Sequence, residues 1–217
     1  MRQMVQQSAF MFADRIRLPL AIDAAGLRDD LDRIDGEGWT NHLVKQNYDG
    51  DWSVLPLRIP VGAVHPVMMI YADPTATAFE DRPLLARTPA FRALLDRLAC
   101  PLLSVRLMRL APGSRIRPHS DHDLAAEWGA ARIHVPIATN DDVEFLLNGE
   151  SVTMPLGSAW YLRLSDPHSV ANRGTTDRIH LVIDCVANAW LLDLLRDGEA
   201  RGDQTKHPIS TMSASIG

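Results

Sequence analysis

The second half of the chain alternates apolar and polar residues with the period of two that a β-strand requires. In residues 131–138, branched aliphatic side chains share one face, whereas Arg132, His134 and Pro136 share the other. Similar patterns predict strands at 103–110, 143–147, 151–154, 158–164 and 178–186. Asn148-Gly149 suits a two-residue hairpin turn. Together these strands indicate a mainly β fold with flanking helices, of the double-stranded β-helix (jelly-roll, cupin-like) class.

Helical periodicity is confined to three segments. Residues 23–34 predict a helix with Asp23 as its N-cap, and a second helix begins at Thr88-Pro89 and runs to Leu98. A short amphipathic helix is expected at 190–196, where its leucines either pack on the core or form a dimer contact. Residues 39–60 show no clear period, and we expect an irregular stretch there.

Length and composition favour one domain. A chain of 217 residues with 46% hydrophobic residues can build one sizeable core. We expect a loose N-terminal segment at 1–13 and a single domain at 14–197, with a β-helix core at about 100–187. The polar tail at 198–217 is expected to be disordered.

Charge and cysteine content exclude several classes of partner. The net charge is −5 and no long basic run exists, which argues against nucleic acid and anionic membranes. The apolar runs are too short to span a bilayer. Cys100 and Cys185 form no CxxC pair, so we interpret both as reduced core thiols of a cytoplasmic protein.

A histidine and an aspartate two residues apart, His119 and Asp121, suggest a metal site. Residues i and i+2 of a strand share one face and lie roughly 6.6 Å apart along it. His168 follows the turn signal Asp166-Pro167 and would come from the opposite sheet. Two imidazoles and one carboxylate can occupy one face of a ferrous ion and leave the other open to substrates and O₂. An isolated pair of this kind is more often part of an ordinary exposed strand, but the distal histidine favours a metal.

Arg178 lies ten residues after His168 and strengthens the case for iron. A guanidinium fork binds a carboxylate through two hydrogen bonds, so Arg178 could hold the far carboxylate of 2-oxoglutarate. The alternative is a surface arginine paired with Asp177 or Asp184. Zinc is the rival metal, because it also accepts two histidines and a carboxylate, but zinc would not account for Arg178.

Short strings between residues 14 and 186 carry a resemblance to a known family. They are Asp49-Gly-Asp-Trp52, Leu57-Arg58, Ala111-Pro-Gly113, Pro118-His-Ser-Asp121, Arg132-Ile-His-Val-Pro-Ile137, Thr139-Asn140, Gly149-Glu150, Gly157-Ser-Ala-Trp160, Pro167-His-Ser-Val170, Asn172 and Arg178-Ile-His-Leu-Val-Ile-Asp184. Together they resemble the aspartyl/asparaginyl β-hydroxylase family of Fe(II)/2-oxoglutarate oxygenases, which includes bacterial proline cis-4-hydroxylase-like enzymes.

The resemblance implies a double-stranded β-helix with iron on His119, Asp121 and His168, and with 2-oxoglutarate on Arg178. It also implies that Arg132 and His134 line the pocket and assist a carboxylate of the cosubstrate or substrate. Some family members lack the metal-binding carboxylate. Because this chain keeps Asp121, it looks more like the bacterial, free-standing type.

The expected function is therefore that of a dioxygenase that uses Fe(II), 2-oxoglutarate and O₂. It would hydroxylate a C–H bond of an amino acid or of an aspartyl or asparaginyl residue, and would release succinate and CO₂. A free amino acid is favoured over an Asp- or Asn-containing peptide, and a homodimer is possible. Two alternatives remain: a cupin-type metal-dependent isomerase or hydrolase, and a non-enzymatic ligand-binding jelly roll.

The substrate pocket is the least determined part of the sequence. Trp52 and Arg58 are candidates for binding a carboxylate-bearing substrate, although Trp52 could be a core aromatic and Arg58 a surface ion-pair partner. Asp123 should share the face of His119 and Asp121 and could touch substrate, whereas His122 should point away. Further aromatic candidates for a lid or gate are His42, Tyr48 and Trp128.

Overall fold

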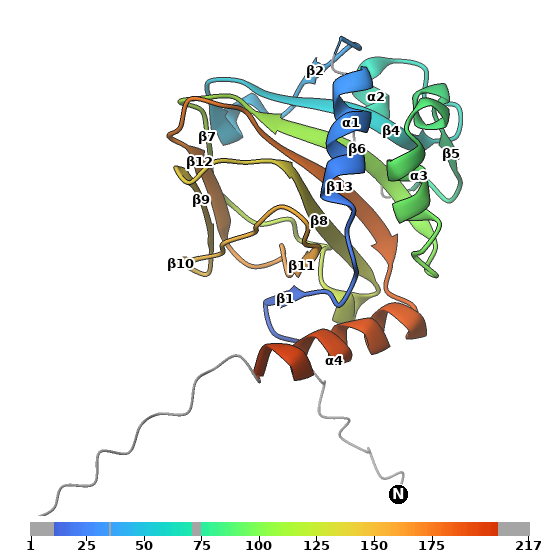
Figure 1. Cartoon of the computed structure of the whole chain (residues 1–217), viewed down its shortest axis with the longest axis vertical. Helices are drawn as coiled ribbons and strands as arrows, with labels where there is room; N and C mark the ends of the chain where they lie inside the picture. The colour runs from blue at the N-terminus through green and yellow to red at the C-terminus, as the bar shows by residue number, and fades with distance from the viewer. Residues whose placement is uncertain (1–10, 35, 71–74, 204–217) are drawn as a thin grey trace, which may run out of the picture.

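Two antiparallel sheets face each other, with helices packed outside the larger one (Figure 1). The computed structural model describes residues 11–34, 36–70 and 75–203. The expectations for residues 1–10 and 204–217 lie outside the described residues. No helix within the described ranges is long and apolar enough to cross a bilayer.

The larger sheet has eight strands, and neighbours in its order are hydrogen-bonded. In order they are β1 (Arg15–Arg17), β11 (Trp160–Leu162), β8 (Ala130–Ala138), β13 (Arg178–Val186), β6 (Leu102–Leu110), β4 (Trp52–Pro60) and β2 (Thr40–Asn41), with β5 (Phe79–Asp81) also paired to β4. The smaller sheet consists of β10 (Glu150–Ser151), β9 (Val143–Leu147), β12 (His168–Asn172), β7 (Arg115–His119) and β3 (Tyr48–Asp49). This arrangement agrees with the predicted mainly β fold.

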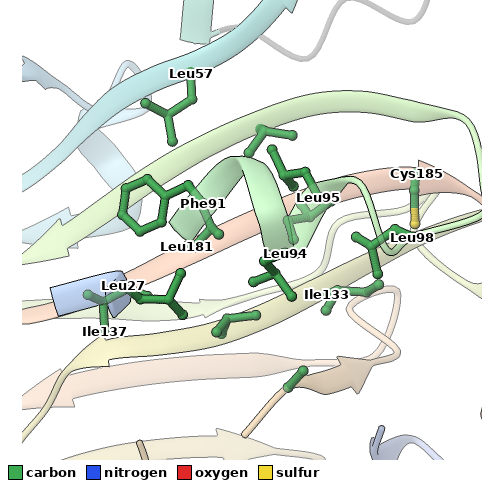
Figure 2. Close-up of a cluster of buried hydrophobic side chains, with 14 of the residues drawn as sticks. Leu27, Leu57, Phe91, Leu94, Leu95, Leu98, Ile133, Ile137, Leu181 and Cys185 are labelled. Atoms are coloured by element: carbon green, nitrogen blue, oxygen red, sulfur yellow. The ribbon is translucent and has the colours of Figure 1, made fainter. Parts of the chain in front are cut away.

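The outer face of the larger sheet packs against helices and forms the main core. The helices of this layer are α1 (Ala24–Ile34), α3 (Pro89–Leu95) and α4 (Ala189–Asp203). The short helix α2 (Pro66–Ile70) contacts β4, and its Ile70 instead packs with residues between the two sheets. Figure 2 shows leucines and Phe91 of the α3 region directed at Leu57, Leu181 and Ile133, which come from three different strands. Odd-numbered residues of β4, β6, β8 and β13 belong to this cluster. Their even-numbered neighbours therefore face the space between the two sheets.

A buried aspartate joins two helices of the outer layer. Asp30 of α1 is fully buried, and its Oδ2 accepts hydrogen bonds from the backbone N–H groups of Ala90 at 2.6 Å and Phe91 at 2.9 Å. Arg33 donates to its other oxygen. Thr88 precedes α3 but makes no side-chain capping bond, so Asp30 supplies the cap from a neighbouring helix.

The prediction of an irregular stretch at 39–60 is wrong. Trp52–Pro60 forms β4, which pairs with β6 on one side and with β2 and β5 on the other. The ladder with β6 is irregular between Pro56 and Arg58. A proline has no N–H to donate, and strands accommodate it at such irregularities. The two prolines of this segment concealed a nine-residue strand.

The C-terminal helix is longer than predicted. It was expected at 190–196 and followed by a disordered tail from 198, but α4 continues to Asp203. Gly198, the first residue of the expected tail, lies inside α4 against β1: a Cβ there would come within 2.5 Å of Ile16 Cγ2. Leu191 and Leu195 are fully buried in the main core, so the apolar stripe of α4 packs on its own domain.

Other local predictions hold. Asn148 and Gly149 have φ values of 54° and 78°, as the predicted two-residue turn requires. Asp23 accepts a hydrogen bond from the N–H of Gly26 at 3.0 Å and so caps α1. Cys100 and Cys185 are buried and free.

Candidate active site

His119, Asp121 and His168 converge at one end of the smaller sheet. His119 is the last residue of β7 and His168 is the first residue of β12, and the two are direct partners in the ladder. Asp121 lies just beyond β7, where its N–H donates to the carbonyl of Leu164 at 2.8 Å. One ligand atom from each of the three residues lies within 4.8 Å of the others. The smaller sheet therefore gathers the proposed triad from distant parts of the chain.

Backbone carbonyls orient both imidazoles. Nδ1 of His119 lies 2.8 Å from the carbonyl oxygen of Arg117, and Nδ1 of His168 lies 3.0 Å from that of Asp166. In the tautomer that donates these bonds, the proton is on Nδ1 and Nε2 is free to bind a metal. Burial is the main cause that lowers the pKa of His168, which keeps the ring neutral as a ligand must be.

The carboxylate of Asp121 is held from one side. Its Oδ2 accepts a hydrogen bond from Nη1 of Arg132 at 2.6 Å, and its Oδ1 lies 3.9 Å from Nε2 of His119. Burial alone would raise the pKa of Asp121, but Arg132 and the two histidines outweigh it, so the pKa lies below its usual value. Asp121 is therefore ionised, with one oxygen bound to Arg132 and the other directed towards the histidines.

Arg178 is buried without a carboxylate partner among the described residues. Its side chain lines the same cavity, the residue is 3% exposed, and its Nε has no hydrogen-bond partner. Nη2 lies 3.0 Å from Nδ1 of His180, and the guanidinium lies 6.0 Å from the centre of the Phe145 ring. Burial lowers the pKa of Arg178 to about 9. The alternative of a surface pair with Asp177 or Asp184 is thereby excluded.

Arg132 and His134, neighbours on the inner face of β8, differ in their surroundings. All three guanidinium nitrogens of Arg132 bind protein carboxylates, those of Asp121 and Asp184. Arg132 lines the cavity as expected, but three of its five N–H groups are already bound to these protein carboxylates. His134 has two buried ring nitrogens without partners, and burial holds its pKa well below the usual value. It is a neutral imidazole that can still donate or accept one hydrogen bond.

Trp52 lines the cavity together with His42. The two rings are stacked, with centroids 3.5 Å apart and planes inclined by 10°. Tyr48 lies edge-on to Trp52 and donates its hydroxyl to the carbonyl of His42 at 3.1 Å. Tyr48 is thus a buried support for the other two rings. Trp128, considered as a gate, is 66% exposed and is not among the residues that line the cavity.

Arg58 does not belong to the site, which corrects the prediction. It pairs with Asp81 at 2.6 Å and donates to the carbonyl groups of Phe79 and Leu102. The register of β4 with β6 shifts between Pro56 and Arg58, so the alternation of inner and outer faces does not continue unchanged to Arg58. Arg58 is therefore the ion-pair partner that the alternative interpretation described.

Asp123 and His122 are both exposed and both line the cavity. His122 was expected to point away from Asp121 by strand alternation, but β7 ends at His119, so alternation does not apply to it, and it lines the cavity. Asp123 lies where it was expected, at the cavity wall.

The cavity has a volume of about 750 Å³ and includes residues that sequence reasoning missed. Arg106 of β6 is the most important of these, because it is a buried cation with an unpaired Nε. Its position on the inner face of β6, between Ser104 and Met108, follows from strand alternation and could have indicated it. Five of the seven buried side-chain nitrogen and oxygen atoms without partners belong to cavity residues, namely Trp52, Arg106, His134 and Arg178.

Comparison with known proteins agrees with this geometry. L-proline cis-4-hydroxylase of Rhizobium meliloti (strain 1021) is 29% identical over 179 residues, which are 82% of this chain and 62% of the relative. The chain therefore spans less than two thirds of that relative's length. The crystal structure of an oxidoreductase of the 2OG-Fe(II) oxygenase family from Burkholderia pseudomallei has a TM-score of 0.54 at 14% identity. The matched region covers 81% of this chain and 85% of the Burkholderia pseudomallei protein.

The structural likeness supports the fold alone, and it confirms the predicted double-stranded β-helix. The sequence likeness goes further, because the family model described as aspartyl/asparaginyl beta-hydroxylase matches residues 23–188. This range includes all three residues of the triad and Arg178. The chain belongs to the aspartyl/asparaginyl β-hydroxylase family.

Proposed function

We propose that this protein is an Fe(II)- and 2-oxoglutarate-dependent dioxygenase that hydroxylates a C–H bond of an amino acid and releases succinate and CO₂. The observation that carries the proposal is the presence of His119, Asp121 and His168 in the same cavity as Arg178, a buried arginine without a counter-ion. A metal ion would bind the triad, and a dicarboxylate would supply the counter-ion for Arg178.

The triad fits a ferrous ion. Two imidazoles, each with Nδ1 beside a backbone carbonyl, and one ionised carboxylate form the donor set that non-haem iron oxygenases use. Iron bound there would supply the O₂ chemistry that couples oxidative decarboxylation of 2-oxoglutarate to hydroxylation. The residues described here bind the reactants, orient them and exclude water.

The buried arginine fits the cosubstrate. A guanidinium in a low-dielectric site binds a carboxylate strongly, and Nε of Arg178 is still free for one of the two bonds of a fork. His134 lies on the same inner sheet face and offers a neutral ring nitrogen beside it. We assign Arg178 to the far carboxylate of 2-oxoglutarate and His134 to a further hydrogen bond.

An amino acid is the substrate class that we favour. The relative from Rhizobium meliloti is named as a hydroxylase of L-proline, which is a free amino acid. The stacked rings of His42 and Trp52 form an apolar wall, and the buried Nε1 of Trp52 lacks a partner. Asp123, at the exposed side of the cavity, could attract an ammonium group. We further infer a cytoplasmic protein, because Cys100 and Cys185 are free thiols.

The proposal is tested by measuring succinate formed from 2-oxoglutarate by the iron-loaded protein in air. The panel contains free amino acids with proline among them, their N-acetylated and amidated forms, and short peptides with Asp or Asn. Stimulation by a free amino acid, and not by its capped form, is the expected result. Stimulation by peptides alone would move the substrate to an aspartyl or asparaginyl residue. No succinate from folded, iron-loaded protein would favour a cupin-type enzyme or a binding module.

A further inference from the structure

Asp184 is a buried carboxylate in the cavity for which the proposed function has no role so far. It lies on β13, whose neighbours are β8 and β6. Asp184 is in register with Arg132 of β8, and Arg106 of β6 is in register with Val182, two residues earlier. Strand alternation puts these charged residues on one sheet face. The register of three strands therefore brings one carboxylate between two arginines.

The contacts form one continuous chain. Nε and Nη2 of Arg132 donate to the two oxygens of Asp184 at 2.6 and 3.0 Å, which is a bidentate fork. Arg106 donates from Nη2 to Asp184 Oδ2 at 2.9 Å. The remaining nitrogen of Arg132, Nη1, donates to Asp121 at 2.6 Å. Asp184 thus fixes two of the three nitrogens of Arg132, and the third holds the candidate metal ligand.

Stability alone is a weak reason for this network. Arg106, Arg132 and Asp184 are 4%, 8% and 6% exposed, so three charged groups have lost nearly all their water. Buried ion pairs of this kind are often no more stabilising than well-packed apolar residues. Burial would raise the pKa of Asp184, but Arg106 and Arg132 outweigh it and keep the group ionised. The network instead restricts Arg132 to one orientation.

The fixed orientation of Arg132 in turn restricts the side chain of Asp121, to which it donates a hydrogen bond. Asp121 lies beyond the end of β7, and its side chain is 31% exposed, so the strand ladder does not hold it. We propose that Asp184 is a positioning residue for the metal centre: it orients Arg132, which holds one oxygen of Asp121 and leaves the other for the metal. The inference rests on the proposed function, because it requires a metal at the triad.

A matched control exists elsewhere on the larger sheet. Asp81 also binds two arginines, Arg58 at 2.6 Å and Arg92 at 2.7 Å, but it does not line the cavity. Asp81→Asn and Asp184→Asn each replace a carboxylate by a carboxamide and each remove one negative charge. Asp81→Asn therefore controls for the loss of one unit of net charge and of an Asp–Arg pair away from the cavity, and the Asp184→Asn/Arg106→Met variant below balances the charge inside it.

The experiment is a Co(II) titration of the metal-free protein, followed by visible absorption, with circular dichroism as the check on folding. Groups that orient a metal ligand typically change metal affinity by about 10- to 100-fold. We expect Asp184→Asn to weaken Co(II) binding within this range and to alter the Co(II) spectrum, and Asp81→Asn to match the wild type. The variant Asp184→Asn/Arg106→Met removes one charge of each sign. If Asp184→Asn does not fold, this variant takes its place in the Co(II) titration, with the same expected result.

The outcomes separate this inference from the proposed function. If the wild type binds Co(II) and Asp184→Asn binds it equally well with the same spectrum, the positioning role is wrong and the proposed function stands. Equal weakening in Asp81→Asn would reduce the effect to charge and would also overturn the role. Loss of folding in both Asp184 variants would show that the residue is needed for folding, and would overturn the positioning role. A wild type that binds no Co(II) would contradict both proposals.

Discussion

Replacing Arg178 by methionine should stabilise the metal-free protein while it weakens binding of 2-oxoglutarate. The guanidinium is buried, and its pKa falls from its usual range to about 9 because burial disfavours the charge. The unfolded chain keeps its proton up to the higher value, so the penalty on folding is present in full at neutral pH and is relieved only above pH 9. Its upper bound is about 5 kcal/mol.

The loss of one hydrogen bond reduces this gain. The variant loses the hydrogen bond between Arg178 and Nδ1 of His180, which leaves a buried acceptor unpaired at a cost of about 1–3 kcal/mol. Methionine is unbranched and flexible, so it retains most of the packing of the arginine stem. The net result is a gain in the free energy of unfolding of about 2 kcal/mol. For a chain of this length, that raises the melting temperature by about 4–8 °C.

The assay combines calorimetric unfolding of the metal-free protein with titration of 2-oxoglutarate into the Mn(II)-loaded protein. Removing one partner of a buried charged pair typically costs about 2–5 kcal/mol, so 2-oxoglutarate should bind at least about 30-fold more weakly. Arg58→Met is the control, because Arg58 is already paired with Asp81 and lies outside the cavity. A less stable Arg178→Met protein that binds 2-oxoglutarate normally would refute the reasoning.

Two further predictions concern stability. Asp30→Ala removes the cap that Asp30 provides for α3 and leaves two backbone N–H groups unpaired; the free energy of unfolding should fall by about 2–4 kcal/mol in urea, and a loss below about 0.5 kcal/mol would contradict this role. His180 has a pKa well below its usual value because of burial and Arg178, so the unfolded state binds a proton that the folded state does not. The free energy of unfolding of the metal-free wild type should therefore decline as pH falls below about 6.5. His180→Asn should reduce the slope of this free energy against pH by up to about 1.4 kcal/mol per pH unit. Equal slopes for the two proteins in denaturant titrations would exclude this contribution of His180.

The regular strands were predictable because they depend on local sequence, and the candidate triad was indicated by His119 and Asp121 together with the distant His168. Strand alternation specified the inward faces of β8 and β13, and a histidine and an aspartate two residues apart marked the rim. β4 was missed because Pro56 and Pro60 are unfavourable in strands, and the extension of α4 was missed because the chain is polar from Gly198 onward. In both cases tertiary packing overrides the local preference.

The partners of the charged residues could not be predicted. Asp184 was considered as a partner for Arg178, six residues away on the same strand, but it binds Arg132 and Arg106 on the neighbouring strands instead. That choice depends on strand order and register, which a single sequence does not specify. Arg58 was misassigned for the same reason, since its partner Asp81 comes from β5.

Hydroxylation that depends on 2-oxoglutarate and on the triad is checked by measuring succinate and hydroxylated amino acid together, with iron-loaded wild type and Asp121→Ala. The wild type should form equal amounts of the two products, and a folded Asp121→Ala protein should form neither. Hydroxylation that persists in Asp121→Ala would contradict the assignment of the triad. A folded, iron-loaded wild type that forms no succinate with any amino acid or peptide would contradict the proposed function itself.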